Sequence, residues 1–263
     1  MIETMTRPAS GGMDPGTGIA SEAEFQVRRD LAACYRLVAH YGWDDLIFTH
    51  ISAHVPGSGN KRFLINPFGM LFDEITASSL VKIGLDGERA EAGTQPVNPA
   101  GFLIHGAVHE ARADVGCVIH LHTDATVAVS ILEEGLEALS QNSLIPASGI
   151  AYHDYEGFVL SEAEKHRLVA SLGQRNFMIL RNHGVLTCGE TIADAFLRMF
   201  FLERACRIQL LAQSSGKALR PIGREVAASV AADFAAAGGS NPGNFVWPAM
   251  LRKLDRVSPG YAD

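Results

Sequence analysis

The chain has 263 residues, of which 47% are hydrophobic, and its 22 lysines and arginines against 29 aspartates and glutamates give a formal net charge of −7. This acidic balance argues against a nucleic-acid or anionic-membrane partner, because basic surfaces bind phosphate groups. No uncharged apolar run approaches the ~18 residues that a membrane span requires. The hydrophobic content is sufficient for a sizeable core, in one large α/β domain or two small ones.

Residues 1–20 are rich in glycine, proline, threonine and serine, which predicts a disordered N-terminal tail. This tail lacks the basic region followed by an apolar region that marks a signal peptide. The cysteines lie far apart and form no C-x-x-C pair, which argues against a disulfide scaffold or a cysteine zinc site. Their usage suits a reducing compartment, so we expect a cytoplasmic protein with buried Cys34, Cys117, Cys188 and Cys206.

The first predicted elements are a helix and a pair of strands. An S-x-x-E capping box at residues 21–24 opens a helix that ends at Gly42. Residues 48–55 alternate as a strand, and after a turn at 56–60 the chain returns as a strand over 62–66. One face of the first strand carries three polar side chains, those of His50, Ser52 and His54.

The middle of the chain continues this mixture of strands and helices. We expect a short helical turn at 76–81 and a hairpin tip at 86–87. Asn98 followed by Pro99 opens a helix to about Ala113. The next elements are a strand over 116–122 and a helix that begins at Thr123 or Asp124.

The last third predicts two longer helices around a strand pair. A second capping box opens a helix over 161–173, strands follow at 177–180 and 185–187, and Thr191 caps a long amphipathic helix to Leu210. The alternation of strands and helices predicts one α/β domain over residues 21–215. Residues 216–263 are expected to be a helical extension of that domain.

Three histidines form the sharpest chemical pattern in the sequence. His120 and His122 are two residues apart in a predicted strand, so their side chains project to the same face. His183 lies at a tight turn between two strands, where it can reach the same ion. Three imidazoles with an open fourth position are typical of a catalytic transition-metal site. The alternative is a set of polar histidines that are hydrogen-bonded within the protein.

The sequences His120-x-His122-Thr123 and Asn182-His183-Gly184-Val185, together with residues 63–69, 80–81 and 85–87, resemble the class II aldolase/adducin head domain. The resemblance spans about residues 24–210. It implies a three-layer α/β/α fold with a central mixed or antiparallel sheet, and a homotetramer with active sites between subunits. It also implies that His120, His122 and His183 bind a divalent transition metal, with zinc as the first choice.

The chain departs from the sugar-phosphate aldolases of this family at one decisive place. Those enzymes carry a Ser-Ser-Glu run that binds substrate phosphate and moves the substrate proton. The matching stretch here is Asn98-Pro99-Ala100-Gly101, which has neither hydroxyl nor carboxylate. A Gly-Asn phosphate-binding pair is replaced by Thr49-His50. The resemblance therefore favours a non-phosphorylated substrate, and it is nearest to the adducin branch, which lacks the same carboxylate.

Other residues are candidates for the missing chemistry. His105 lies one helical turn after Gly101 and can approach the metal as a proton-transfer group, or it is a buried, hydrogen-bonded histidine. Arg181, beside His183, can pair with a substrate carboxylate or with an acidic neighbour. Asn66 and Gly69 are candidate substrate contacts. His50 and His54 either line the pocket or lie on a solvated strand face. The loop 152–156 and Tyr261 are candidates to reach the site of a neighbouring subunit, or they are ordinary surface residues.

Two main functions follow from this pattern, and a third option is a His-ligated hydrolase or oxygenase, for which the sequence supplies no evident facial-triad carboxylate. The first is a metal-dependent lyase that cleaves or decarboxylates a small non-phosphorylated oxo- or hydroxy-acid by Lewis-acid polarisation. The second is a non-catalytic, adducin-like oligomeric module that keeps a metal site. Retention of all three histidines favours a metal role, whereas loss of the Ser-Ser-Glu run favours the module over a sugar-phosphate aldolase.

Overall fold

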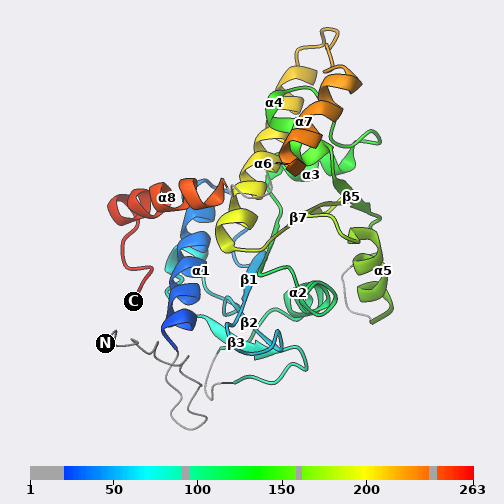
Figure 1. Ribbon diagram of the computed structural model, residues 1–263. Helices are drawn as coiled ribbons and strands as arrows, with labels where there is room; N and C mark the ends of the chain where they lie inside the picture. Colours follow the sequence, from blue (N-terminus) through cyan, green and yellow to red (C-terminus); the bar gives the residue numbers. More distant parts are fainter. Residues whose placement is uncertain (1–20, 91–94, 158–161, 237–241) are drawn as a thin grey trace, which may run out of the picture.

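A computed structural model describes residues 21–90, 95–157, 162–236 and 242–263 (Figure 1). Its centre is a seven-stranded sheet in the order β3-β2-β1-β4-β7-β6-β5. In chain order the strands are β1 (His50–His54), β2 (Arg62–Ile65), β3 (Val81–Gly84), β4 (Cys117–Leu121), β5 (Ile150–His153), β6 (Phe177–Leu180) and β7 (Gly184–Gly189). Neighbouring strands are antiparallel except for the parallel pair β5–β6, so the sheet is mixed, as expected.

Helices cover both faces of the sheet, which confirms the three-layer α/β/α fold (Figure 1). On one face, α1 (Glu22–His40) and α6 (Ile192–Gln213) bury side chains such as Ile51 and Ile119. On the other face, α2 (Pro99–Ala111) and α5 (Glu162–Leu172) bury the alternate residues of the same strands. This division follows from the two-residue period of a strand, which sends adjacent side chains to opposite layers.

The remaining helices gather around α6 and α1. They are α3 (Asp124–Ile131), α4 (Gln141–Ala147), α7 (Arg224–Ala236), α8 (Gly243–Val257) and the short 3₁₀ helix η1 (Phe72–Glu74). Figure 1 shows α3, α4 and α7 beside one end of α6, and α8 against α1. No helix in the described part of the chain is long and apolar enough to cross a membrane.

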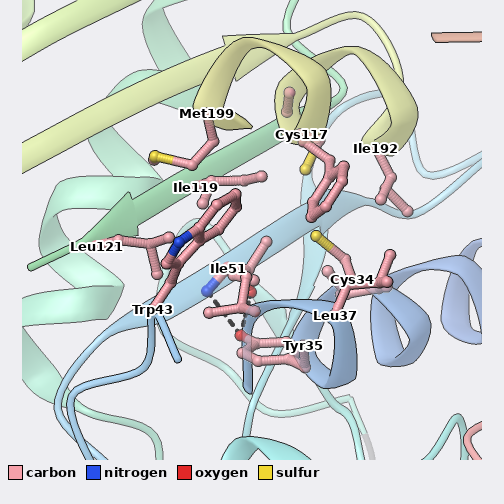
Figure 2. Close-up of a cluster of buried hydrophobic side chains, with 14 of the residues drawn as sticks. Cys34, Tyr35, Leu37, Trp43, Ile51, Cys117, Ile119, Leu121, Ile192 and Met199 are labelled. Atoms are coloured by element: carbon pink, nitrogen blue, oxygen red, sulfur yellow. Dashed lines mark hydrogen bonds between the residues drawn. The ribbon is translucent and has the colours of Figure 1, made fainter. Parts of the chain in front are cut away.

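A buried tyrosine ties α1 to the strands beside the predicted site (Figure 2). The Tyr35 hydroxyl accepts hydrogen bonds from the backbone N–H of Ile51 at 2.7 Å and of Asn66 at 3.1 Å. Two acceptors for its single hydrogen lie within hydrogen-bond distance, the Ile51 carbonyl and the Asn66 Oδ1. Asn66, a predicted substrate contact, is therefore only 4% exposed and holds the end of β2 against α1.

The predicted helix starts agree with the observed caps. The side chains of Ser21, Thr123 and Thr191 each accept a hydrogen bond from the backbone N–H three residues on, which is the usual N-cap contact. The four cysteines are buried and unbridged. Ser161 and residues 1–20 lie outside the described residues.

One predicted element is shorter than expected. The short helical turn predicted at 76–81 is a single turn, in which the Ser79 N–H donates to the Thr76 carbonyl at 3.1 Å. The Thr76 and Ser79 side chains accept from each other's backbone N–H groups, at 3.3 and 2.9 Å. The turn does not continue to Val81, because Val81 begins β3 and pairs with Ile65 of β2.

Candidate metal centre

The three predicted histidines converge at one end of the sheet. His120 is on β4, His122 is the first residue after the end of β4, and His183 occupies the turn between β6 and β7. One ring nitrogen from each lies within 4.8 Å of the other two. Within the described residues, no other group of three histidine, cysteine or acidic side chains meets the same test.

The sequence around His183 is required by the geometry of its turn. Asn182 has a φ of 58°, a left-handed conformation that asparagine adopts more readily than most residues. At Gly184, an added Cβ would lie 2.5 Å from the Leu121 carbonyl oxygen and 2.8 Å from Cδ2 of His122. Asparagine before the histidine and glycine after it therefore allow His183 to approach the other two imidazoles.

Hydrogen bonds fix the orientation of two of the rings. Nδ1 of His120 donates to the Val185 carbonyl at 3.0 Å, and Nδ1 of His122 donates to Oδ2 of Asp45 at 3.0 Å. A neutral imidazole with its hydrogen on Nδ1 has a lone pair on Nε2. The two Nε2 atoms lie 2.9 Å apart, so two lone pairs face each other. A shared cation would relieve that repulsion, and the donor set suits a transition metal.

Burial keeps His120 and His183 in the neutral form that binds metals. It lowers the pKa of His120 well below the ordinary histidine value, with further lowering from the neighbouring His122 and His183. The pKa of His183 falls to about 4, first because of burial and then because of His122. Both rings are therefore uncharged at neutral pH, and a metal ion has no proton to displace from them.

A fourth histidine stands behind the cluster. His50 is opposite His120 in the β1–β4 pairing, and their ring centroids are 5.0 Å apart. Its ring lies against Gly101 on α2, where an added Cβ would be only 2.6 Å from Cδ2 of His50. The space beside position 101 is therefore filled by the imidazole of His50, which is 2% exposed.

His105, the predicted proton-transfer residue, reaches this region only through His50. It is fully buried, and both of its ring nitrogens are hydrogen-bonded. Nε2 contacts Nδ1 of His50 at 2.8 Å, and Nδ1 contacts Oγ of Ser52. Ser52 Oγ also contacts Nε2 of His109 at 2.7 Å. His50 is thus part of a buried polar row, and the expectation of a solvated strand face is wrong for this residue.

The other predicted site residues lie around the cluster without joining it. The Arg181 guanidinium donates to the Leu132 and Glu133 carbonyls and stacks 4.3 Å from the Tyr152 ring centroid, so it has protein partners rather than a free face. Gly69 is exposed, with a φ of 106°. The Tyr261 hydroxyl contacts Asp255 at 2.9 Å, which satisfies it within this chain.

The loop 152–156 contributes one side chain near the cluster. The Tyr155 ring is half exposed, and its centroid lies 6.3 Å from that of His183. Glu156 pairs with Arg167 and lies 3.8 Å from Nε2 of His153. The Glu156 carboxylate therefore has its ion-pair partner within the same subunit.

Asp45, Ser52 and His109 contribute polar contacts to this region but were not among the predicted site residues. Asp45 lies in a loop with no recognisable pattern, although it orients His122. The contacts that Ser52 makes with His105 and His109 depend on the packing of α2 over β1. The spacing of His105 and His109, four residues apart on one helix, was the available signal for this buried row.

The family named "Class II Aldolase and Adducin N-terminal domain" matches residues 29–210. The chain belongs to the class II aldolase/adducin family. A "Putative aldolase class 2 protein" of Pseudomonas aeruginosa is 55% identical over 244 residues, which are 92% of this chain and 93% of that protein.

Two further comparisons cover both branches of the class II aldolase/adducin family. The crystal structure of an aldolase II superfamily protein from Pseudomonas syringae superposes with a TM-score of 0.87 at 46% identity, over 93% of this chain and 98% of that chain. Alpha-adducin of Mus musculus is 43% identical over 200 residues, which are 74% of this chain and 27% of adducin.

Proposed function

We propose that this family member is a metal-dependent carbon–carbon lyase, acting by aldol cleavage or decarboxylation on a small, non-phosphorylated oxo- or hydroxy-acid. The observation that carries the proposal is the convergence of three imidazoles, two of which bring their Nε2 atoms to 2.9 Å while each Nδ1 is hydrogen-bonded to another partner.

His120, His122 and His183 would hold a divalent transition metal, with zinc as the first choice for an all-imidazole site. When bound, such an ion polarises a substrate carbonyl as a Lewis acid. Asp45 and the Val185 carbonyl hold two of the ligand rings in the tautomer that presents Nε2. These contacts pre-organise the site, because metal-bound imidazoles keep their orientation through hydrogen bonds from the other ring nitrogen.

The start of α2 supports a substrate without phosphate. Asn98 caps the helix by accepting a hydrogen bond from the Ala100 N–H at 3.1 Å, and Pro99 has no N–H to offer. Neither Ala100 nor Gly101 supplies a hydroxyl group. The helix start therefore offers no hydroxyl group, and two of the backbone positions with which a helix start commonly holds phosphate have no N–H available, at Pro99 and Ala100.

The assembly belongs to the same proposal. We take the active form to be a cytoplasmic homotetramer, as the family resemblance implies. Leu46 and Phe48, next to Asp45 in the loop before β1, are 63% and 50% exposed. Apolar side chains exposed beside a polar centre are typical of a surface that a second subunit covers. A mass measurement that gives a monomer with full activity would contradict this part of the proposal.

A substrate screen tests the enzymatic proposal. The purified chain, loaded with zinc or another divalent transition metal, is mixed with small oxo- and hydroxy-acids and with matched sugar phosphates, and carbonyl products and carbon dioxide are measured. We expect turnover of an acid that requires the metal and disappears in His122→Ala. His166→Ala, at an exposed position on α5, is the matched control. Turnover confined to sugar phosphates would contradict the proposed substrate class.

The second candidate is a non-catalytic, adducin-like module with a metal site. It is favoured by one observation, the absence of a side chain at Gly101, together with the likeness to adducin. This candidate predicts stoichiometric metal without turnover of any compound in the screen. That result would support the metal site and overturn the lyase proposal.

A further inference from the structure

A row of buried polar side chains lies between β1 and α2, leading away from the three-histidine cluster. It consists of His50, His105, Ser52 and His109, which are between 0% and 2% exposed. Burying so many polar groups costs free energy unless they are hydrogen-bonded. Apolar clusters flank the row on this face of the sheet, and at its far end the ring of His54 lies with its centroid 4.2 Å from that of His109. Such a concentration calls for a specific role.

Each side chain in the row contacts the next one through a hydrogen bond. His50 Nδ1 meets His105 Nε2, His105 Nδ1 meets Ser52 Oγ, and Ser52 Oγ meets His109 Nε2. Each contact needs one hydrogen, and a neutral imidazole or a hydroxyl supplies one hydrogen only. The direction of the His50–His105 hydrogen bond therefore sets the direction of the His105–Ser52 hydrogen bond.

With neutral rings, both tautomers of His50 are compatible with these contacts. In the first, every hydrogen points from His109 toward His50, and His50 carries its hydrogen on Nε2. In the second, the hydrogens point from His50 through His105 to Ser52, whose oxygen can accept a second hydrogen from His109 or donate to it, and His50 keeps a lone pair on Nε2. The tautomer of His50 is thus linked to the direction of hydrogen bonding in the row, although His105, Ser52 and His109 never reach the cluster.

The His50 ring lies close to the three-histidine cluster, and its Nε2 atom is the one that faces the tautomer question. Its ring centroid is 5.0 Å from that of His120, and no hydrogen bond to its Nε2 is found in the described part of the chain. On its other side the ring occupies the space that a Cβ at position 101 would need, so a residue larger than Gly101 would displace the ring. The imidazole is therefore fixed in position with one nitrogen uncommitted.

We propose that Nε2 of His50 forms a hydrogen bond to an oxygen of the substrate at this centre, and that Ser52, His105 and His109 are positioning residues that fix its ring and tautomer. This inference rests on the proposed lyase function for its substrate. The tautomer of His50 is a property of the protein alone and is tested without any substrate.

Nitrogen-15 NMR of the histidine rings tests the positioning row in the full chain, with and without zinc. Wild type should show one neutral tautomer for His50 and a scalar coupling across the His50–His105 hydrogen bond. Ser52→Ala, which removes the central hydroxyl, should give a mixture of tautomers and weaken that coupling. Ser52→Thr should restore the wild-type spectrum. Ser143→Ala is the matched control, because this buried serine bonds only to Ser140 on α4.

Activity provides the second readout, once a substrate is found. His50→Phe keeps a buried ring but loses the nitrogen, and should lower kcat about 100-fold while zinc stoichiometry is unchanged. Ser52→Ala should lower kcat about 10-fold with little change in KM, and Ser52→Thr should recover it. If Ser52→Ala fails to fold, His109→Gln serves as the second variant that breaks the row.

The results separate the two proposals. An unchanged single tautomer of His50 in Ser52→Ala or His109→Gln would overturn the positioning role, whatever the activity. Wild-type kcat in a zinc-loaded His50→Phe would overturn the substrate contact. Absence of any turnover in the screen, with the tautomer shift observed, would overturn the lyase function and the substrate contact, and leave the positioning row established.

Discussion

His50 fills the space that a side chain at position 101 would occupy: a Cβ on Gly101 would lie 2.6 Å from Cδ2 and 3.0 Å from Nε2 of the His50 ring. The two residues come from β1 and α2, more than 50 positions apart in the printed sequence. They are complementary, since the large polar ring is possible only because the helix carries no side chain there. The departure from the sugar-phosphate aldolases at Gly101 is therefore matched by a second departure at His50.

Gly101→Ala is expected to destabilise the protein. The added methyl group would displace a fully packed ring, and overpacking of this kind costs roughly 1–3 kcal/mol of unfolding free energy. Gly106→Ala, on the same helix, is the matched control because a Cβ there meets nothing within 4 Å. It should be neutral or stabilise by up to ~1 kcal/mol through helix propensity.

Urea unfolding of the two glycine variants and of His50→Ala/Gly101→Ala measures this coupling. Because removing the His50 ring creates room for the methyl group, the double variant should lose less stability than the sum of the single variants. Strict additivity would show that the two residues do not compete for the same space.

Asp45→Asn is expected to weaken metal binding without removing a ligand. The carboxylate accepts from Nδ1 of His122 at 3.0 Å and so fixes the tautomer that exposes Nε2. Loss of such a partner typically lowers metal affinity 10- to 100-fold. Competition with a fluorescent zinc chelator measures the change, and Asp44→Asn is the neighbouring control. Equal affinities for wild type and Asp45→Asn would contradict an orienting role for Asp45.

Acid should destabilise the fold through its buried histidines. Burial, with a smaller contribution from His54, lowers the pKa of His109 to about 3. The unfolded chain, with histidine near its ordinary pKa of about 6.5, therefore binds more protons than the native state between these two values. The stabilisation is complete above pH ~6.5 and declines as the pH falls toward about 3, by about 1.4 kcal/mol per pH unit for this group.

Urea unfolding across this acid range checks the sign and size of the effect. His109→Gln, which cannot titrate, should remove about 1.4 kcal/mol per pH unit from the slope. His166→Gln, at an exposed position on α5, is the matched control substitution. A slope that is the same in wild type and His109→Gln would refute the assignment.

The local features of the metal centre could be predicted from the sequence. The two-residue period of a strand places His120 and His122 on one face, and the Asn182-His183-Gly184 turn has the residues that its backbone requires. The strand and helix pattern also predicted the α/β fold, because apolar periodicity and capping residues act over short distances. The helical turn expected at 76–81 is shorter than predicted because Val81 pairs with Ile65 in the sheet, a long-range contact.

The polar row beside the cluster could not be predicted in the same way. It depends on the β1–β4 register that sets His50 opposite His120, and on the packing of α2 over β1. Both are long-range relationships that a single sequence does not encode in any local pattern. Asp45 is a similar case, since a loop aspartate gives no indication of which imidazole it will meet.

Metal stoichiometry is the most direct test of the central claim. Wild-type protein, His183→Ala and the exposed-position control His166→Ala are incubated with zinc, freed of excess metal and measured by mass spectrometry of the element. The site predicts one tightly held ion per chain in wild type and in His166→Ala, and its loss in His183→Ala. Wild-type protein without stoichiometric metal, or His183→Ala with the same metal content as wild type, would contradict the three-histidine centre.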